Sequence, residues 1–439
     1  MGKGNEMSIR IAYWDRYSEE EKKSLFERSE TDISEVLEAA RGIIETVHLK
    51  GDQALIEYTR VFDGIDLKSI PIRVEPAEFQ AAESSLDPDL KKSIEFAVST
   101  VWDFHSSQKP EALSFSPLFK GLIAGEKSSP IDSAGLYVPR GRGSFPSMLY
   151  MLAVPAKIAG VPAISIVTPP GRDGSVDPAC LFAAGLLDID HVYRVGGAQA
   201  IAALAFGTET IPAVQKIIGP GSRYVTAAKR ILSSTVDTGL PAGPSESMIV
   251  ADESADPWNT ALDLMVEAEH GSDSCAILLT DSERLAEQVK TNIELLLGDV
   301  PEPRLGFLKD VFKRYGGIIL TDSIGAAVEI VNRFAPEHLQ LRTADPFSLL
   351  DSIRNAGEIL LGEHLPFSAA NYATGANAVL PTGGWASTYS PVSVRDFMKF
   401  SSVVYAEPSG YRTLKDHVIR LADYEGFITH GNALKLRHE

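Results

Sequence analysis

The sequence predicts an α/β protein made of two blocks of parallel sheet and helices, followed by a helical C-terminal tail. From about residue 133 onward, short apolar runs rich in branched residues alternate with helical patterns at the spacing of βαβ units. The length of 439 residues allows two or three domains at roughly 150 residues each. Hydrophobic residues make up 44% and charged residues 23%, which excludes disordered and fibrous proteins.

The first third of the chain predicts helices. Residues 34–47 repeat apolar side chains at helical spacing, and Gly51 follows as a stop signal. A second helical pattern covers residues 88–108. We expect these helices to cover a sheet or to form an arm.

The middle of the chain predicts alternating strands and helices. Strands are expected at residues 135–138, 164–167, 192–195, 217–218, 248–250, 276–279, 317–320 and 359–361. Helices are expected at residues 146–159, 178–187, 199–206, 224–232, 256–270 and 281–297. The motif LPAGPSE at residues 240–246 predicts a tight turn at the junction of the two blocks.

Charge and cysteine content exclude several classes of protein. The net charge of −18 disfavours non-specific binding to nucleic acid or to an anionic membrane. Cys180 and Cys275 are too few for a disulfide framework or a thiolate zinc site. The N-terminus shows no signal peptide, and the longest apolar region, residues 148–167, is interrupted by two prolines and a lysine. We therefore expect a cytoplasmic soluble protein.

Glycine-rich turns follow three of the predicted strands. They span residues 138–147, 194–200 and 218–225, although the dinucleotide fingerprint G-x-G-x-x-G is absent. Glycine lets backbone N–H groups approach a phosphate, and the N-terminus of a helix favours an anion. These turns predict either a nucleotide site or ordinary connections between strands and helices.

Two further groups of polar residues could carry chemistry. Glu267 and His270 share one side of a predicted helix, as two ligands of one metal ion must, and His430 follows far downstream. A surface ion pair would show the same spacing. Glu337 and His338 are adjacent after a proline, so they could serve two proton transfers in a cleft. A loop with one residue exposed and one packed is the alternative.

The order of motifs resembles that of the histidinol dehydrogenase family. The motifs are AGLYVPRG, RVGGAQAIAALAFGTETI, LPAGPSE, EAEHGSDS, FAPEHLQ and NYATGANAVLPT, then the late pair Thr429 and His430. The resemblance covers residues 30–437. It implies a homodimer that binds NAD and one zinc ion per subunit and oxidises a primary alcohol, through the aldehyde, to an acid.

The resemblance also implies two Rossmann-like parallel-sheet domains, one inserted in the other, with helical N- and C-terminal arms that intertwine the dimer. We expect an N-terminal arm at residues 1–30 and a large domain formed by residues 31–136 and 244–390. The inserted NAD-binding domain is expected at residues 137–243, and a tail that crosses the dimer interface at residues 391–439.

Site residues follow from the same resemblance. Glu337 and His338 correspond to the catalytic pair, in which the histidine removes the alcohol proton and the glutamate activates water. Residues that correspond to NAD contacts are Tyr137, Gln199 and Ser222. Those that correspond to zinc ligands are Glu267, His270, Asn371 and His430, and those at substrate-contacting positions are Ser245, Phe367, Ala378 and Glu425. In the family, the last glutamate and the last histidine come from the neighbouring subunit, which makes each site composite.

This chain departs from the family pattern at several of these positions. Glu267 replaces a glutamine and Asn371 replaces an aspartate, so the formal charge of the metal ligands is unchanged. Phe367 replaces an acid, Ala378 replaces a histidine, and Ser222 replaces an asparagine, without compensation. The lost polar groups favour another small polar alcohol over L-histidinol, which stays open as a substrate.

Two other function classes stay open. A metal-dependent hydrolase or lyase would use a metal-bound water and would need no NAD. A catalytically silent member of the family would serve an interaction, although the retained Glu337 and His338 speak against it.

Overall fold

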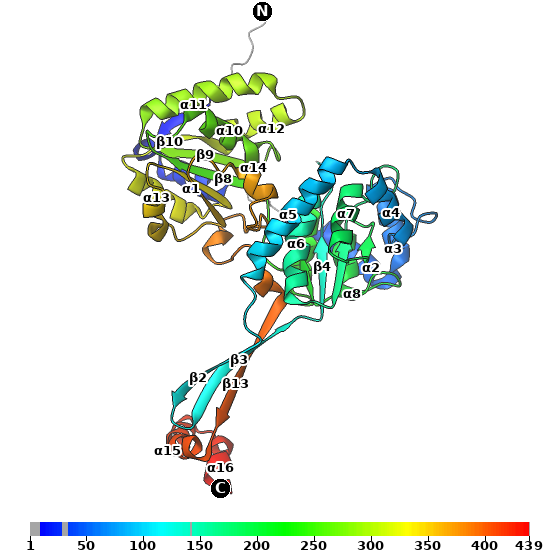
Figure 1. The fold of residues 1–439 in the computed structure, drawn as a ribbon, viewed down its shortest axis with the longest axis vertical. Helices are drawn as coiled ribbons and strands as arrows, with labels where there is room; N and C mark the ends of the chain where they lie inside the picture. Colours follow the sequence, from blue (N-terminus) through cyan, green and yellow to red (C-terminus); the bar gives the residue numbers. More distant parts are fainter. Residues whose placement is uncertain (1–8, 29–33, 141–142, 439) are drawn as a thin grey trace, which may run out of the picture.

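The protein has three parts: two α/β domains side by side and a long arm that projects away from both (Figure 1). The structure, a computed structural model, describes residues 9–28, 34–140 and 143–438. No helix among these residues is both long enough and apolar enough to cross a membrane.

The larger domain is built on a six-stranded sheet in which every neighbouring pair is parallel. Its strand order is β1 (Ile11–Tyr13), β10 (Gly316–Leu320), β9 (Cys275–Thr280), β8 (Glu246–Ala251), β11 (His338–Arg342) and β12 (Glu358–Leu361). Strands β8, β9 and β11 are buried at every residue, as expected for a parallel sheet covered on both faces. The helices of this domain are α1 (Glu19–Glu27), α10 (Pro257–Ala268), α11 (Glu283–Leu296), α12 (Arg304–Arg314), α13 (Ile324–Phe334) and α14 (Phe367–Tyr372).

The smaller domain is built on a four-stranded parallel sheet. Its strand order is β6 (Val192–Tyr193), β5 (Ala163–Val167), β4 (Ser133–Tyr137) and β7 (Lys216–Ile218). The helices that follow these strands in the chain are α6 (Pro146–Ala159), α7 (Pro178–Leu186), α8 (Gly197–Phe206) and α9 (Arg223–Leu232). After α9, the chain passes through residues 240–245 into β8 of the larger sheet.

The early helices pack on the smaller domain, which corrects the predicted grouping of residues 31–136 with the larger sheet. These helices are α2 (Ser34–Lys50), α3 (Asp52–Phe62), α4 (Pro76–Ser85) and α5 (Pro88–Ser106). Ile94 and Val101 of α5 share a core with Leu136 of β4, and Ile44 of α2 shares a core with Ile201 of α8. Periodicity identifies the apolar face of a helix but not the surface that the face meets.

The described part of the predicted N-terminal arm belongs to the larger domain instead. Strand β1 pairs with β10 at the edge of the six-stranded sheet. Helix α1 is capped by Ser18, and its Phe26 packs against Phe334. The rest of the predicted arm, at residues 1–8 and 29–30, lies outside the described residues.

The projecting arm contains strands as well as the predicted helices. Its antiparallel sheet has the order β13 (Met398–Ala406), β3 (Leu122–Pro130) and β2 (Leu113–Phe119). Helices α15 (Pro408–Glu425) and α16 (Ile428–Lys435) lie at its tip, drawn in red in Figure 1. The predicted tail at residues 391–439 therefore contains, ahead of its helices, a strand that pairs with a hairpin from much earlier in the chain. Short 3-10 helices complete the fold at Trp14–Arg16, Leu297–Asp299, Phe347–Ser352, Trp385–Ser387 and Val394–Phe397.

Candidate active site

A cavity of about 380 Å³ is lined by residues of both α/β domains. From the smaller domain, Pro139 and Pro220 line it just beyond the carboxyl ends of β4 and β7. From the larger domain, Glu337 and His338 line it at the amino end of β11. Ligands of open parallel sheets bind at the carboxyl ends of strands, so the smaller sheet presents its usual binding edge to this cavity.

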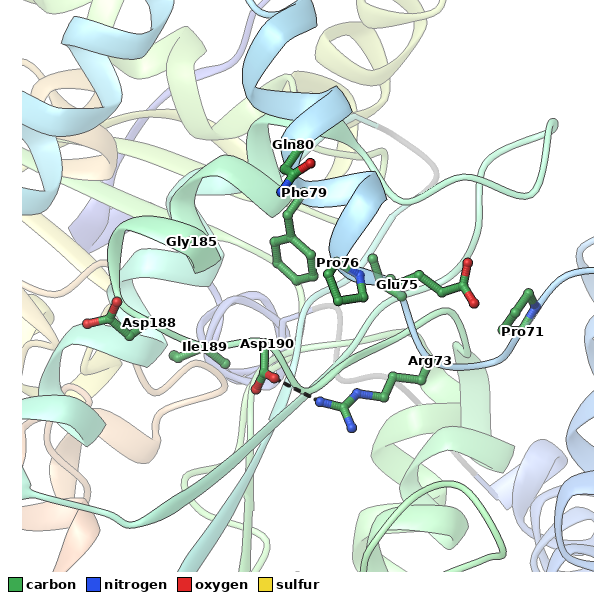
Figure 2. A pocket seen from close by; sticks show the side chains of 11 residues that line it. Pro71, Arg73, Glu75, Pro76, Phe79, Gln80, Gly185, Asp188, Ile189 and Asp190 are labelled. Carbon is green, nitrogen blue, oxygen red and sulfur yellow. Dashed lines mark hydrogen bonds and ion pairs between the residues drawn. The ribbon is translucent and has the colours of Figure 1, made fainter.

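A wider hollow on the smaller domain contains none of the predicted site residues (Figure 2). It measures about 700 Å³ and is open to solvent. Arg73 crosses it to pair with Asp190 at 2.9 Å, and Phe79 forms part of its apolar wall. The cavity between the domains is therefore the candidate active site.

Glu337 and His338 lie together in this cavity, and both are buried. Glu337 Oε1 is 3.9 Å from His338 Nε2. Glu337 Oε2 accepts a hydrogen bond of 2.9 Å from the backbone N–H of Glu246, the first residue of β8. The pair stands where β11 begins, after the left-handed residue Ala335 that ends α13.

Two acidic residues that support this pair were not predicted. Glu358 begins β12, opposite His338 in the register, and its Oε2 is 3.0 Å from His338 Nδ1. Glu246 forms a buried ion pair of 2.8 Å with Arg28. The predicted strand at residues 359–361 begins one residue after Glu358. An acidic residue immediately before a buried strand was therefore the sequence signal that could have identified Glu358 as a site residue.

Three of the four predicted metal ligands come together beside the catalytic pair. Helix α10 begins after the N-cap Asp256 and ends at Ala268, which leaves Glu267 in the last turn and His270 in the loop that follows. Glu267 Oε2 is 2.9 Å from His270 Nδ1, and Asn371 Nδ2 donates to Glu267 Oε1 at 2.6 Å. Ser245 Oγ is 3.0 Å from His270 Nδ1, so this predicted substrate residue joins the same cluster.

The chemistry of these donors fits a divalent cation. A carboxylate, an imidazole and an amide are in direct contact, and Glu267 is only 1% exposed. Half a turn of the Asn371 amide exchanges its nitrogen and oxygen, so the oxygen can be presented to a cation. Within the described residues no set of three His, Cys, Asp or Glu side chains is arranged around a metal position. A cation held by Glu267 and His270 would therefore need an amide and a further residue to complete its ligand set.

The predicted residues Glu425 and His430 lie elsewhere in this chain. Both are exposed, at the end of α15 and in α16, at the tip of the projecting arm (Figure 1). Neither is among the described residues that line the cavity.

The predicted NAD-binding residues lie at or beyond the carboxyl ends of the smaller sheet. Tyr137 ends β4, and its buried hydroxyl accepts a hydrogen bond of 3.1 Å from the backbone N–H of Gly197. Gln199 in α8 is buried, and its Oε1 has no hydrogen-bond partner among the described residues. Ser222 is exposed at the N-cap of α9, where its side chain makes no capping bond. An unpaired buried acceptor and a free helix N-terminus fit a nucleotide.

The two altered substrate positions differ in their surroundings. Ala378 lines the cavity. Phe367, at the start of α14, is completely buried, and its ring meets His338 edge-on at 5.8 Å between centroids. Phe367 is not among the described residues that line the cavity, so it contacts His338 rather than the space for a substrate.

The charges of these groups depend on one another. Burial raises the pKa of Glu337 to about 8. Burial opposes a charge on His338, but the carboxylate of Glu267 and the hydrogen bond to Glu358 outweigh it and raise the pKa of His338 to about 10. Burial also opposes a charge on Glu267, yet the imidazoles of His338 and His270 lower its pKa to about 2. The metal-free site therefore holds a carboxylate and an imidazolium at neutral pH.

Comparisons with known proteins decide the family. The sequence model described as histidinol dehydrogenase matches residues 26–438. The histidinol dehydrogenase of Synechocystis sp. is 49% identical over 410 residues, which are 93% of this chain and 94% of the relative. The chain belongs to the histidinol dehydrogenase family. The family prediction made from the motifs is confirmed.

Other members of the family agree with this placement. A protein named histidinol dehydrogenase homolog from Rhizobium meliloti is 47% identical, over 97% of this chain and 94% of its own length. A crystal structure of histidinol dehydrogenase from Elizabethkingia anophelis matches with a TM-score of 0.92 and 35% identity, covering 98% of this chain and 97% of that one. The α/β fold with parallel sheets is confirmed by this likeness. Members of the family are NAD-dependent oxidoreductases that act on a CH–OH group.

Proposed function

We propose that this protein oxidises a primary alcohol through the aldehyde to the acid with NAD, and that L-histidinol is its first candidate substrate. The observation that carries this proposal is the cavity in which Glu337 and His338 face the carboxyl ends of β4 and β7. The names of the relatives from Synechocystis and Methanosarcina barkeri support histidinol as the substrate.

The catalytic pair supports two proton transfers. His338, in its neutral form, would take the proton of the substrate hydroxyl at Nε2 in the oxidation of the alcohol to the aldehyde. NAD, bound at the carboxyl ends of the smaller sheet, would supply the hydride acceptor for each oxidation. Glu337, whose burial holds its pKa near 8, then takes a proton from the water that attacks the aldehyde carbon. Oxidation of the resulting hydrate would then give the acid, with His338 again placed to take the hydroxyl proton.

The polar cluster beside the pair would hold a divalent cation. Glu267, His270 and Asn371 supply three donors of suitable chemistry. A cation bound there would polarise the substrate oxygen and offset the negative charge of Glu267. Ser245, in contact with His270, would orient the substrate beside these donors.

A homodimer would complete the site. His430 of the partner subunit would supply the fourth ligand, and Glu425 of the partner subunit would contact the substrate. The arm that carries both residues in each chain exposes large apolar side chains at its tip. These are Leu421, Tyr424, Phe427 and Ile428, which are 62%, 92%, 53% and 74% exposed. Large exposed apolar patches mark interaction surfaces.

A second candidate substrate is a small polar alcohol without the imidazole of histidinol. Ala378 offers the cavity no hydrogen-bonding side chain, and Phe367 fills the space beside His338 with a phenyl ring. A site discriminates strongly when it lacks the partner of a polar substrate group.

The formation of NADH tests the proposal. Purified protein with NAD and a divalent metal should produce two NADH per alcohol, and His338→Ala should abolish both oxidations. Glu337→Gln should retain the first oxidation and lose the second. Thermal stabilisation by NAD separates this function from a hydrolase or lyase, because only a ligand of the folded protein raises the melting temperature. A melting temperature that NAD leaves unchanged would contradict the proposal.

A further inference from the structure

The imidazole of His338 is held on two sides by residues outside the cavity lining. Glu358 Oε2 lies 3.0 Å from Nδ1, and the ring of Phe367 packs edge-on against the imidazole at 5.8 Å. The side chains of His338 and Glu358 are 3% and 6% exposed. The remaining ring nitrogen, Nε2, lies on the side of Glu337.

Glu358 is itself placed by the sheet. Its residue is opposite His338 in the parallel register of β11 and β12, and its backbone N–H donates to the carbonyl of Glu337 at 2.9 Å. Glu358 is therefore aligned by a backbone hydrogen bond to Glu337, the residue that precedes His338. A rigid strand pair, rather than a loop, sets the distance between carboxylate and imidazole.

The contact with His338 is the side-chain interaction that the structure shows for the carboxylate of Glu358. Its Oε1 is buried and has no hydrogen-bond partner among the described residues. A buried carboxylate is costly unless it is paired and hydrogen-bonded, and the contact with His338 is the pairing that the structure shows. An ionised carboxylate only accepts hydrogen bonds, so it requires the proton on Nδ1.

We propose that Glu358 is a positioning residue that keeps the proton of His338 on Nδ1 and leaves Nε2 to act on the substrate. This inference rests on the proposed function in one respect, that His338 is the base. The orientation of a catalytic imidazole by a carboxylate on its other nitrogen is a general device of enzymes.

The substitution Glu358→Gln removes the charge with almost no change of shape. We expect kcat to fall by roughly 10- to 100-fold, with little change in KM for NAD or for the alcohol. The acidic limb of the pH profile of kcat, where the base His338 becomes protonated, should also move to lower pH, which a merely structural role would not produce. Glu363→Gln is the matched control, because Glu363 follows the other end of β12 and forms an ion pair with Arg342 at 2.7 Å. This control should behave as the wild type.

A second measurement does not depend on activity. Nitrogen NMR of zinc-loaded protein with labelled histidine, recorded at a pH at which the imidazole of His338 is neutral, should show His338 protonated at Nδ1 and not at Nε2, with its signals identified by their loss in His338→Ala. Glu358→Gln should change these signals, and Glu358→Asp, which keeps the charge, should retain the proton on Nδ1. If Glu358→Gln does not fold, the test is the histidine spectrum of Glu358→Asp, in which the proton should remain on Nδ1.

Two outcomes would overturn the inference. One is a wild-type His338 without a proton on Nδ1, and the other is a folded Glu358→Gln protein with unchanged kcat, pH profile and histidine signals. A wild-type protein that oxidises no alcohol would contradict the proposed function instead, and the histidine spectra would still decide the role of Glu358.

Discussion

At the scale of single residues, Glu267 is one of the acidic residues that set the charge of His338. Burial opposes an imidazolium, but the carboxylate of Glu267, together with the hydrogen bond to Glu358, raises the pKa of His338 above its ordinary value of 6.5 to about 10. Because the folded-state pKa is raised, the interaction stabilises the metal-free protein fully below about pH 6.5. This stabilisation is lost as the pH rises through about 10.

The substitution Glu267→Gln should therefore lower the pKa of His338 in the metal-free protein. Titration of its imidazole by NMR measures the change, and the loss of stability should move to lower pH. Zinc added to the wild type should shift the pKa in the same direction, because a cation offsets the carboxylate. Glu269→Gln is the control, since Glu269 is exposed in the same segment. An unchanged His338 pKa in Glu267→Gln would show that another group raises it.

A substitution at Ala378 tests whether the site prefers histidinol or another alcohol. The side chain lines the cavity, and the family resemblance places a histidine there. If the missing imidazole limits the use of histidinol, Ala378→His should raise kcat/KM for histidinol by roughly tenfold. A hydrogen bond to a charged group contributes about 1.5–3 kcal/mol. The rate with an alcohol that lacks an imidazole should not rise. Efficient oxidation of histidinol by the wild type would instead show that the cavity needs no histidine.

At the scale of elements, apolar sequence runs predicted the buried strands of both parallel sheets. The eight predicted strands overlap β4, β5, β6, β7, β8, β9, β10 and β12. Strand β11 was not predicted, because it begins with His338 and ends with Arg342, and its polar side chains are buried among partners from other elements. A buried polar strand has no signature in composition alone.

The arm could not be predicted for a different reason. Strands β2 and β13 are largely exposed and mix serine with aromatic residues, so they lack a continuous apolar run. Strand β13 pairs with β3, which is far away in the sequence. The backbone hydrogen bonds of such a ladder depend on a partner that no local pattern identifies.

Gly357 immediately precedes β12 and lies against the backbone of Glu337, one residue of the proposed catalytic pair. A Cβ atom at this position would lie 2.5 Å from the carbonyl oxygen of Glu337 and 3.3 Å from Leu380 Cβ. Gly357→Ala should displace the start of β11, lower activity, and reduce the free energy of unfolding by about 1–3 kcal/mol. Denaturant unfolding and NADH formation measure the two effects.

Gly325→Ala is the control for that substitution. Gly325 lies within α13, and the nearest atom to an added Cβ is Ser323 Oγ at 3.7 Å. Alanine favours a helix over glycine by about 1 kcal/mol, so this variant should be as stable as the wild type or more stable. Equal loss of activity in both variants would mean that contact with Glu337 is not the cause.

At the scale of the whole molecule, the candidate site of one chain contains three of its four expected metal ligands. Glu267, His270 and Asn371 are in contact, whereas His430 is exposed at the tip of the projecting arm. The resemblance to the family was needed to add Asn371 to the ligands and to expect His430 from a second chain. Sequence spacing cannot show whether a distant residue returns to its own chain or reaches a second one.

Mixing two inactive variants distinguishes these possibilities. Glu267→Ala removes a ligand from the cavity of its own chain, and His430→Ala removes the ligand that we propose each chain donates to its partner. Each variant alone should bind metal weakly and lack activity. In a hybrid dimer, one site would lack both ligands, while the other would combine an intact cavity with an intact His430 of the partner subunit.

Random reassociation of equal amounts should therefore restore roughly a quarter of the wild-type activity, because half of the dimers are hybrids with one complete site. Metal content, measured on the separated hybrids, should rise in parallel. Two copies of the same variant, unfolded and refolded together, provide the control and should stay inactive. If the mixture also stays inactive although hybrids form, His430 does not complete the site of a partner, and the proposed composite site is wrong.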